Sequence, residues 1–251
     1  MAKHIDLNCD MGEGFGAWSM GQDEALLELV TSANIACGYH AGDPATMTRV
    51  VRLAVAKGVA VGAHPSLPDL QGSGRRTMAI SPEEARGMTL YQMGALEAFA
   101  RAAGGRLSHV KAHGALYNMA AKDRRLADAI ASAVRDFDPS LILVGLSGSE
   151  LIKAGRALGL TCASEVFADR GVEPDGSLTP RGQPGAMIED EDLAVARVLR
   201  MVREGKVAGR DGVDVAIQAD TVCIHGDQPK ALAFARRLRE ALEQAGVEVR
   251  A

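Results

Sequence analysis

The sequence predicts an α/β fold in which seven parallel strands, each followed by a helix, form a closed or nearly closed barrel. Seven short apolar segments alternate with amphipathic helical patterns along the 251 residues, which predicts parallel strands joined by right-handed crossovers. Residues 141–144 are apolar throughout, as in a parallel strand that is covered on both faces. Polar residues follow nearly every strand, and this favours a barrel over an open doubly wound sheet.

The size and composition are those of an ordinary globular protein. The length fits a single domain, 1–251, with 47% hydrophobic and 24% charged residues. No apolar run approaches the roughly 20 residues that span a bilayer, and the chain enters its first strand without a secretory signal, so we expect a cytoplasmic protein. A net charge of -4 with scattered Lys and Arg excludes a nucleic-acid-binding surface.

Cysteine usage fits a reducing compartment. No Cys-x-x-Cys pair occurs, and each cysteine falls within an apolar segment, so we expect small buried thiols. The four are Cys9, Cys37, Cys162 and Cys223.

The first half of the chain predicts four strand–helix units. Residues 5–10 alternate between apolar and polar, which predicts a first strand whose polar face carries Asp6, Asn8 and Asp10. An Asp-Pro pair begins the helix at 44, a glycine ends it, and a Ser-Pro-Glu-Glu capping box begins the helix at 82. Further strands are expected at 33–38, 59–63 and 107–110, and helices at 23–30, 44–57 and 82–103. After Gly114 one helix is expected, with an inner face formed by Leu126, Ile130, Ala133, Val134 and Phe137.

The second half continues the pattern with one long interruption. Strands are expected at 141–144, 160–164 and 221–224, with helices around 151–158, from 189, and at 231–242. Residues 171–186 are rich in Gly and Pro and are predicted to be an unstructured lid. Residues 205–220 are ambiguous, although the alternation over 213–217 is compatible with an extra β segment.

The carboxyl ends of the predicted strands carry most of the chemistry-bearing residues. Any one of them has a structural explanation, since Asp43 and Asp227 fit helix N-caps. Parallel strands nevertheless bring all these ends to one rim, so the set as a whole predicts a catalytic site. The residues are Asp10, Glu13, His40, Asp43, His64, Lys111, His113, Glu165, Arg170, His225 and Asp227.

Two mechanisms could use such a rim. Asp10, His40 and His64 are candidate ligands for a divalent metal that would make hydroxide available. Without a metal, Asp10 or a histidine would act as general base while Lys111 and His113 stabilise a developing oxyanion. The spacing matches no compact ligand motif, so both remain open. On the long loops, Arg75, Arg76 and Arg170 are candidates for binding a carboxylate or phosphate.

Seven segments of the chain resemble one known family over almost its whole length. They are IDLNCDMGEG, SANIACGYHAGD, GVAVGAHPSLPD, HVKAHGALYN, LILVGLSGSEL, EVFADRGVEPDGSLTPR and TVCIHGD. Together they are similar to the LamB/YcsF lactam-utilisation family. The resemblance implies a seven-stranded β/α barrel like those of glycoside hydrolases and sugar deacetylases, and a component of an ATP-dependent 5-oxoprolinase that opens 5-oxo-L-proline to L-glutamate.

The resemblance also implies partners and residue roles. Two further subunits would bind ATP and activate the lactam, which agrees with the absence of a Gly-x-x-x-x-Gly-Lys-Ser/Thr loop here; homo-oligomer formation is left open. Asp10, His40 and His64 would position water, Lys111 and His113 would hold the lactam oxygen or its phosphate, and Glu165 would protonate the leaving nitrogen. The family's polar motif positions are Asp10, Glu13, His40, Asp43, His64, Arg75, Lys111, His113, Glu165, Asp169, Arg170 and His225.

Two positions of this sequence depart from the family pattern, and two other functions remain as alternatives to the 5-oxoprolinase component. Leu67 and Ser73 stand where the family often has aromatic residues, which affects the expected substrate preference. The rival functions are a metal-dependent deacetylase or amidase that works alone, and a non-catalytic subunit that binds a lactam or carbohydrate.

Overall fold

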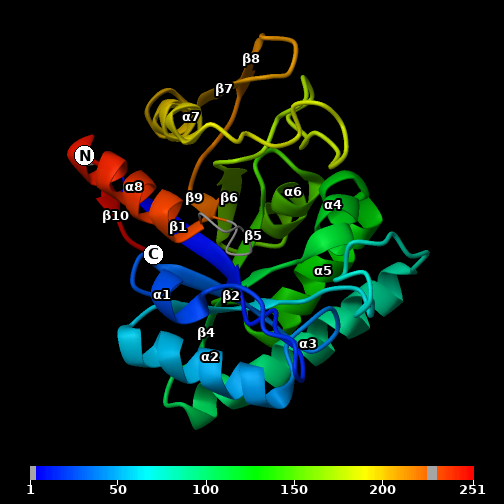
Figure 1. The fold of residues 1–251 in the computed structure, drawn as a ribbon. Helices are drawn as coiled ribbons and strands as arrows, with labels where there is room; N and C mark the ends of the chain where they lie inside the picture. Colours follow the sequence, from blue (N-terminus) through cyan, green and yellow to red (C-terminus); the bar gives the residue numbers. More distant parts are fainter. Residues whose placement is uncertain (1–3, 225–230) are drawn as a thin grey trace.

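A closed barrel of seven parallel strands forms the centre of the protein. The computed structural model describes residues 4–224 and 231–251. Consecutive strands pair in parallel, and β9 pairs with both β6 and β1, which closes the barrel and confirms the predicted fold class (Figure 1). The strands are β1 His4–Met11, β2 Ser32–Ala36, β3 Ala60–His64, β4 Leu107–Lys111, β5 Ile142–Leu146, β6 Cys162–Phe167 and β9 Thr221–Ile224. A short strand, β10 (Glu248–Val249), extends the sheet beside the start of β1.

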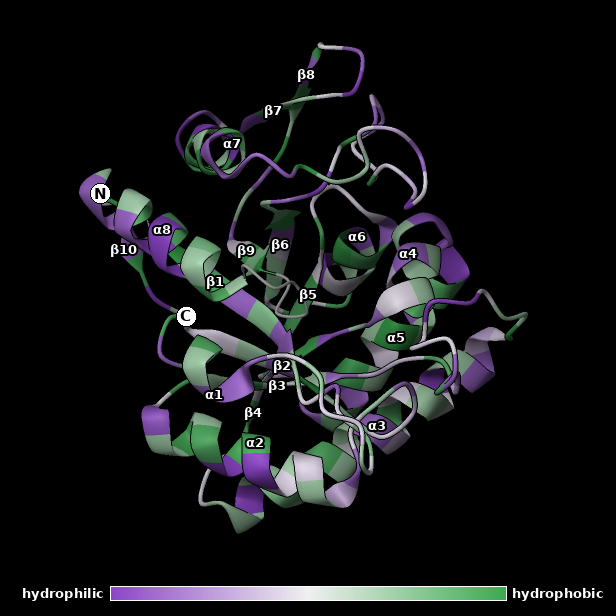
Figure 2. Cartoon of the chain, in the orientation of Figure 1, coloured by the Kyte–Doolittle hydropathy of each residue, from purple (hydrophilic) through white to green (hydrophobic). Residues whose placement is uncertain are grey.

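Amphipathic helices surround the barrel. Their apolar faces turn toward the strands and their polar faces turn outward (Figure 2). Ser81 and Glu84 form the predicted capping box at α3, and Asp43 caps α2 by accepting a hydrogen bond from the Thr46 amide. The described helices are α1 Asp23–Leu26, α2 Pro44–Lys57, α3 Pro82–Ala102, α4 Gly114–Lys122, α5 Arg124–Phe137, α6 Glu150–Ala157, α7 Glu191–Glu204 and α8 Ala231–Gln244.

Two predicted boundaries were wrong, and one helix was not predicted. The single helix expected after Gly114 is α5, and α4 is a separate helix before it, because Asp123 adopts an extended conformation and caps α5 through the Arg125 and Leu126 amides. The first helix is shorter than 23–30 and ends at Leu26. Strand β6 starts and ends later than expected, so Glu165 lies within the strand instead of just after it.

The segment between β6 and β9 forms a separate protrusion at one end of the barrel (Figure 1). It contains α7 and an antiparallel pair, β7 (Lys206–Ala208) and β8 (Asp214–Ala216), so the extra β segment over 213–217 is confirmed in its central part. The loop at 171–186 is not unstructured as predicted, because Val172 pairs with Leu178 and Arg170 pairs with Met187 in isolated antiparallel bridges. In the described part of the chain, no helix is long and apolar enough to cross a membrane.

Candidate active site

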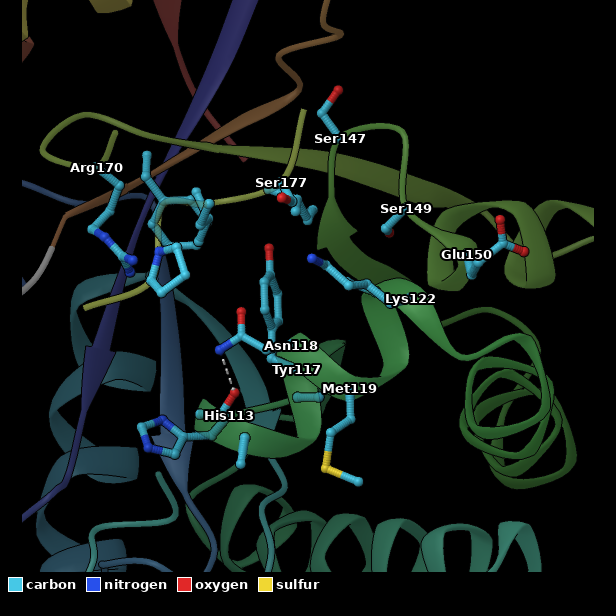
Figure 3. A pocket seen from close by; sticks show the side chains of 18 of the residues that line it. His113, Tyr117, Asn118, Met119, Lys122, Ser147, Ser149, Glu150, Arg170 and Ser177 are labelled. Atoms are coloured by element: carbon cyan, nitrogen blue, oxygen red, sulfur yellow. Dashed lines mark hydrogen bonds between the residues drawn. The ribbon is translucent and has the colours of Figure 1, made fainter. Parts of the chain in front are cut away.

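A cavity of about 840 Å³ opens at the carboxyl ends of the strands. Asp10, His64 and Lys111 line it from strands β1, β3 and β4, His113 lines it from the start of α4, and Arg75 and Arg170 line it from the two long loops. Tyr117 points into it from α4, opposite Arg170 (Figure 3). The structure therefore brings together six of the predicted site residues in one concave space.

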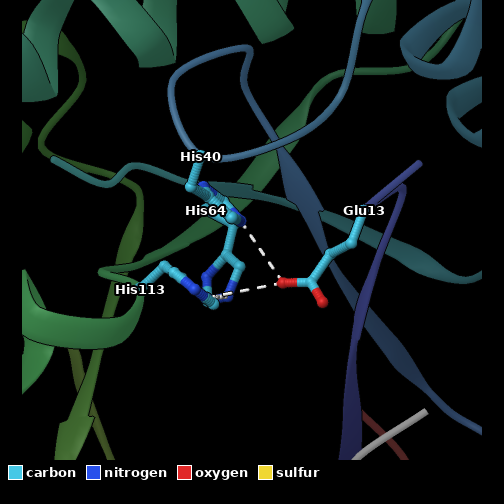
Figure 4. A group of neighbouring side chains, drawn as sticks. All are labelled: Glu13, His40, His64 and His113. Atoms are coloured by element: carbon cyan, nitrogen blue, oxygen red, sulfur yellow. Dashed lines mark hydrogen bonds and ion pairs between the residues drawn. The ribbon is translucent and has the colours of Figure 1, made fainter. Parts of the chain in front are cut away.

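Beside this cavity, one glutamate and three histidines form a compact cluster (Figure 4). One potential ligand atom from each of Glu13, His40, His64 and His113 lies within 4.8 Å of all the others. The Glu13 carboxylate is 3.3 Å from His40 Nε2 and 3.5 Å from His113 Nδ1. The His40 and His113 rings stack with centroids 3.8 Å apart. This donor set of imidazoles and a carboxylate could hold a divalent metal ion.

The hydrogen bonds of the histidines test whether a cation fits there. His64 Nδ1 donates to the Lys111 carbonyl at 2.7 Å, and His113 Nε2 donates to the Ser73 carbonyl at 2.9 Å. In the neutral rings, the remaining atoms, His64 Nε2 and His113 Nδ1, then face each other with lone pairs at 2.9 Å. A positive charge is needed between them, either a shared proton or a metal ion. The backbone carbonyls fix the tautomers as they do in metal sites.

Burial opposes a shared proton. Desolvation and the neighbouring His40 and His64 hold the pKa of His113 well below its ordinary value. Burial, and to a smaller extent the neighbouring His64, likewise lower the pKa of His40, whose Nδ1 is buried without a hydrogen-bond partner among the described residues. The residues present therefore fit a metal ion better than additional protons.

The ligand set differs from the predicted one. Asp10, His40 and His64 were the candidates, but Glu13 and His113 complete the cluster in place of Asp10. Asp10 Oδ1 instead accepts hydrogen bonds from Lys111 Nζ and the Asn34 amide, both at 2.9 Å, and Asp10 Oδ2 lies 3.3 Å from His64 Nε2. Asp10 thus connects the cluster to Lys111.

Lys111 lies between two carboxylates at the floor of the cavity. Its ammonium is 2.9 Å from Asp10 Oδ1 and 2.7 Å from Glu165 Oε1. Burial disfavours the charged form, but the nearby anionic groups, led by Asp10, outweigh it and raise the pKa of Lys111 well above its ordinary value. Burial also opposes ionisation of Asp10, yet His64 and Lys111 hold the Asp10 pKa well below its usual range. Asp10 and Lys111 therefore form a charged pair at neutral pH.

Glu165 lies behind Lys111 and is fully buried. Its second oxygen accepts a hydrogen bond from the Tyr117 hydroxyl at 2.7 Å. Glu165 is not among the described residues that line the large cavity. Glu165 is connected to the cavity by its ion pair with Lys111 and its hydrogen bond from Tyr117, both of which line the cavity.

The predicted arginines occupy different positions. Arg170 is buried, donates to the carbonyls of Ala186 and Thr179, and makes no ion pair with any described carboxylate. Burial lowers the pKa of Arg170 to about 10. Arg76 does not line the cavity, because it pairs with Asp69 within its own loop. His225 and Asp227 lie outside the described residues.

Sequence reasoning did not single out Tyr117, Asn34 or His109, which contact the site residues. Tyr117 follows His113 by one helical turn, and this spacing is the signal that places it on the same rim. Asn34 and His109 lie inside strands that look apolar overall, where no pattern separates a site residue from a structural one.

Comparisons with known proteins show to which family the chain is similar. The model of the LamB/YcsF family matches residues 5–251. A 5-oxoprolinase subunit from Methylococcus capsulatus is 63% identical over 251 residues, which are 100% of this chain and 96% of that protein. The crystal structure of the lactam utilization protein from Thermus thermophilus matches with a TM-score of 0.93 and 54% identity, covering 99% of each chain.

A more distant likeness concerns the fold alone. A family 4 carbohydrate esterase from Streptomyces lividans has a TM-score of 0.50 at 12% identity, covering 98% of this chain and 91% of that one. The barrel fold is thus shared with this carbohydrate esterase, and the family resemblance implied a barrel of the sugar deacetylase kind. The family match over nearly the entire chain, together with relatives above 60% identity, shows that this chain belongs to the LamB/YcsF family.

Proposed function

We propose that this chain is one component of an ATP-dependent 5-oxoprolinase and hydrolyses the lactam bond of 5-oxo-L-proline to give L-glutamate, after partner subunits have activated the lactam. One observation carries the proposal: Asp10, His64, Lys111 and His113 line a single cavity. Two buried cationic side chains, Lys111 and Arg170, line the same cavity. The relative in Methylococcus capsulatus bears the name of this activity, and because that name designates one subunit, it implies further subunits.

The residues divide the hydrolytic step among them. Asp10 and His64 orient the attacking water, and because His64 and Lys111 keep the pKa of Asp10 low, Asp10 positions the water more than it removes its proton. The Lys111 ammonium stabilises negative charge on the lactam oxygen or its phosphate as water adds to the carbonyl carbon. A metal ion held by Glu13, His40, His64 and His113 would supply a Lewis acid and lower the pKa of water.

Breaking the carbon–nitrogen bond requires a proton on the ring nitrogen. Glu165 was expected to donate it, but Glu165 lies behind Lys111, so we propose that Lys111 or Tyr117 gives the proton to the nitrogen. The Glu165 carboxylate would orient both donors, and water in the cavity would return the proton that either one gives up. Arg170 has a buried guanidinium without a described carboxylate partner, so it is suited to the substrate carboxylate or a phosphate, together with Arg75.

ATP use is assigned to the partners. The chain has no Gly-x-x-x-x-Gly-Lys-Ser/Thr loop. A resonance-stabilised lactam resists attack, so phosphorylation of its oxygen elsewhere in the complex would make the ring susceptible to water. We place this complex in the cytoplasm and treat residues 1–251 as one domain.

The decisive experiment follows glutamate release from 5-oxoproline with ATP, using this chain alone, the partner subunits alone, and all together. We expect release only from the complete mixture. Robust release from this chain alone would contradict the dependence on partners. No release from any mixture would contradict the proposed reaction.

The metal-binding cluster favours one rival, an amidase or deacetylase that works alone. Activity on an acetylated sugar or simple amide with added Zn²⁺ and without ATP would support that rival. A wild-type rate for both Asp10→Asn and His64→Ala in the assembled complex would instead indicate a non-catalytic binding subunit.

A further inference from the structure

Below the cavity floor, the barrel interior contains a connected set of buried amides. Asn8 Oδ1 accepts hydrogen bonds from Lys111 Nζ at 3.2 Å and from Asn34 Nδ2 at 2.8 Å. The same Asn34 amide nitrogen donates to Asp10 Oδ1 at 2.9 Å. Asn34 and Asn8 are 0% and 2% exposed, so both contacts are shielded from water. The two amides therefore contact both members of the Asp10–Lys111 ion pair.

The direction of every hydrogen bond in this set follows from a carboxylate at its far end. Asp6 can only accept, and it receives hydrogen bonds from the hydroxyls of Thr221, Thr31 and Ser32. Because the Thr221 hydroxyl donates to Asp6, it accepts from the Asn8 amide nitrogen at 2.6 Å. The Asn8 oxygen must then face Lys111 and Asn34.

The same reasoning fixes Asn34 and ends at His109. Since the Asn34 nitrogen faces Asn8 and Asp10, its oxygen faces His109 Nε2 at 2.8 Å and needs a donor there. His109 supplies that donor as the Nε2–H tautomer, while its Nδ1 accepts from the Ser108 hydroxyl at 2.8 Å. His109 is buried, and burial lowers its pKa to about 4, so the ring is neutral.

The neighbouring strand leaves room for this ring. Gly62 on β3 lies beside Asn34 on β2 and His109 on β4 in the strand registers. A Cβ atom at Gly62 would clash with the His109 imidazole. A glycine is therefore required at this interior position for His109 to reach Asn34.

We propose that Asn34 and His109 are positioning residues, which hold the Asp10 carboxylate and the Lys111 ammonium in the orientation that the reaction uses. Neither residue contacts the substrate space; both are absent from the described lining of the cavity. Without the His109 donor, the buried Asn34 oxygen has lost its partner, so the amide is held on one side only and can shift, which would weaken its hydrogen bond to Asp10 and the contact of Asp10 with Lys111.

The kinetic test uses His109→Leu, which removes the donor, and His109→Gln, whose amide nitrogen can replace Nε2–H. In the assembled enzyme we expect kcat to fall roughly 10- to 100-fold in His109→Leu with a small change in KM, and to recover largely in His109→Gln. Thr89→Val is the matched control, because the Thr89 hydroxyl is fully buried and, among the described residues, its hydrogen bond stays within α3, to the Ala85 carbonyl. Its kcat should equal that of the wild type.

Gly62→Ala provides a second variant if His109→Leu does not fold, because it displaces the ring without deleting a polar group.

The kinetic arm rests on the proposed function, so crystal structures of the variants form an independent arm. We expect the Asp10–Lys111 contact to lengthen beyond roughly 3.5 Å, or the Asn34 amide to rotate, in His109→Leu or Gly62→Ala. Unchanged Asn34, Asp10 and Lys111 geometry would overturn the proposal, as would equal kcat in His109→Leu and the wild type. An inactive wild type would count against the proposed function alone, and the structural arm would still decide the positioning role.

Discussion

At the scale of single residues, Lys111 carries one buried positive charge between two carboxylates. Asp10 and Glu165 lie 2.9 and 2.7 Å from its ammonium, and Asn8 and Cys223 complete its surroundings at 3.2 Å. Taking such charges out of water costs more than their attraction commonly returns. The arrangement is therefore better explained by a requirement of the site than by a gain in stability.

Replacing Lys111 tests this charge balance. Lys111→Met leaves two buried carboxylates near each other without a cation, so we expect the free energy of unfolding to fall by about 3–5 kcal/mol. Denaturant unfolding followed by circular dichroism measures the change. Adding Glu165→Gln should recover part of the loss, because it removes one uncompensated charge.

A surface lysine serves as the control for that experiment. Lys57 pairs with Glu28 on the outside of α2, so Lys57→Met should change the free energy of unfolding by no more than about 1 kcal/mol. Equal losses in Lys57→Met and Lys111→Met would contradict the interpretation.

At the scale of elements, the loop after β3 acquires its shape from Asp69. The Asp69 carboxylate accepts hydrogen bonds from the Gly72 amide at 3.0 Å, the Arg76 amide at 3.2 Å and Arg76 Nε at 2.8 Å. Ser73, at φ 49°, then presents its carbonyl to His113. Ser73 stands where the family often has an aromatic residue, yet its main chain still orients a site histidine. The loop thus links the ion pair between buried Asp69 and exposed Arg76 to the histidine cluster.

The Asp69 contacts predict a specific pH dependence of stability. The hydrogen bond from Arg76 contributes most to lowering the pKa of Asp69, to about 2. A depressed folded-state pKa stabilises the protein above the unfolded value near about 3.9, and this contribution is lost as the pH falls through about 2. Asp69→Asn should therefore lower Tm at pH 7, and the difference from wild type should shrink between about pH 4 and pH 2.

Thermal melts across this pH range measure the effect. Asp128→Asn is the control, since Asp128 is exposed on α5 and pairs with Arg124 one turn away on the same helix. A Tm difference for Asp69→Asn that stays constant down to pH 2 would show that the carboxylate charge does not stabilise the loop.

Local signals explain which elements could be predicted from the sequence. The capping box at Ser81 and the Asp-Pro start of α2 are fixed by neighbouring residues, so both helices were placed correctly. The separate helix α4 and the cap at Asp123 were missed, because an aspartate also fits the polar face of a helix. The pairing of Glu13 with His113 depends on the paths of two loops in space, and sequence spacing does not contain that information.

At the scale of the whole molecule, the two halves of the barrel place different kinds of side chain around one cavity. The first half supplies the histidine cluster, with Glu13 after β1, His40 after β2, His64 at the end of β3 and His113 after β4. The second half supplies Arg170 after β6. A cation is thus favoured on one side and an anionic ligand on the other, which suits a polarised carbonyl bound between them.

A metal ion bound by the first half should stabilise the whole fold. A ligand that binds the folded state alone raises stability by about 2.7 kcal/mol at 100 times its dissociation constant, so Zn²⁺ or Mn²⁺ should raise Tm in metal-free protein. His64→Ala with His113→Ala removes both facing lone pairs and should abolish the rise. His4→Ala, at an exposed position at the start of β1, should retain it. Persistence of the full rise in the double variant would place metal binding elsewhere. No rise in the wild type would indicate that the lone pairs of His64 and His113 share a proton.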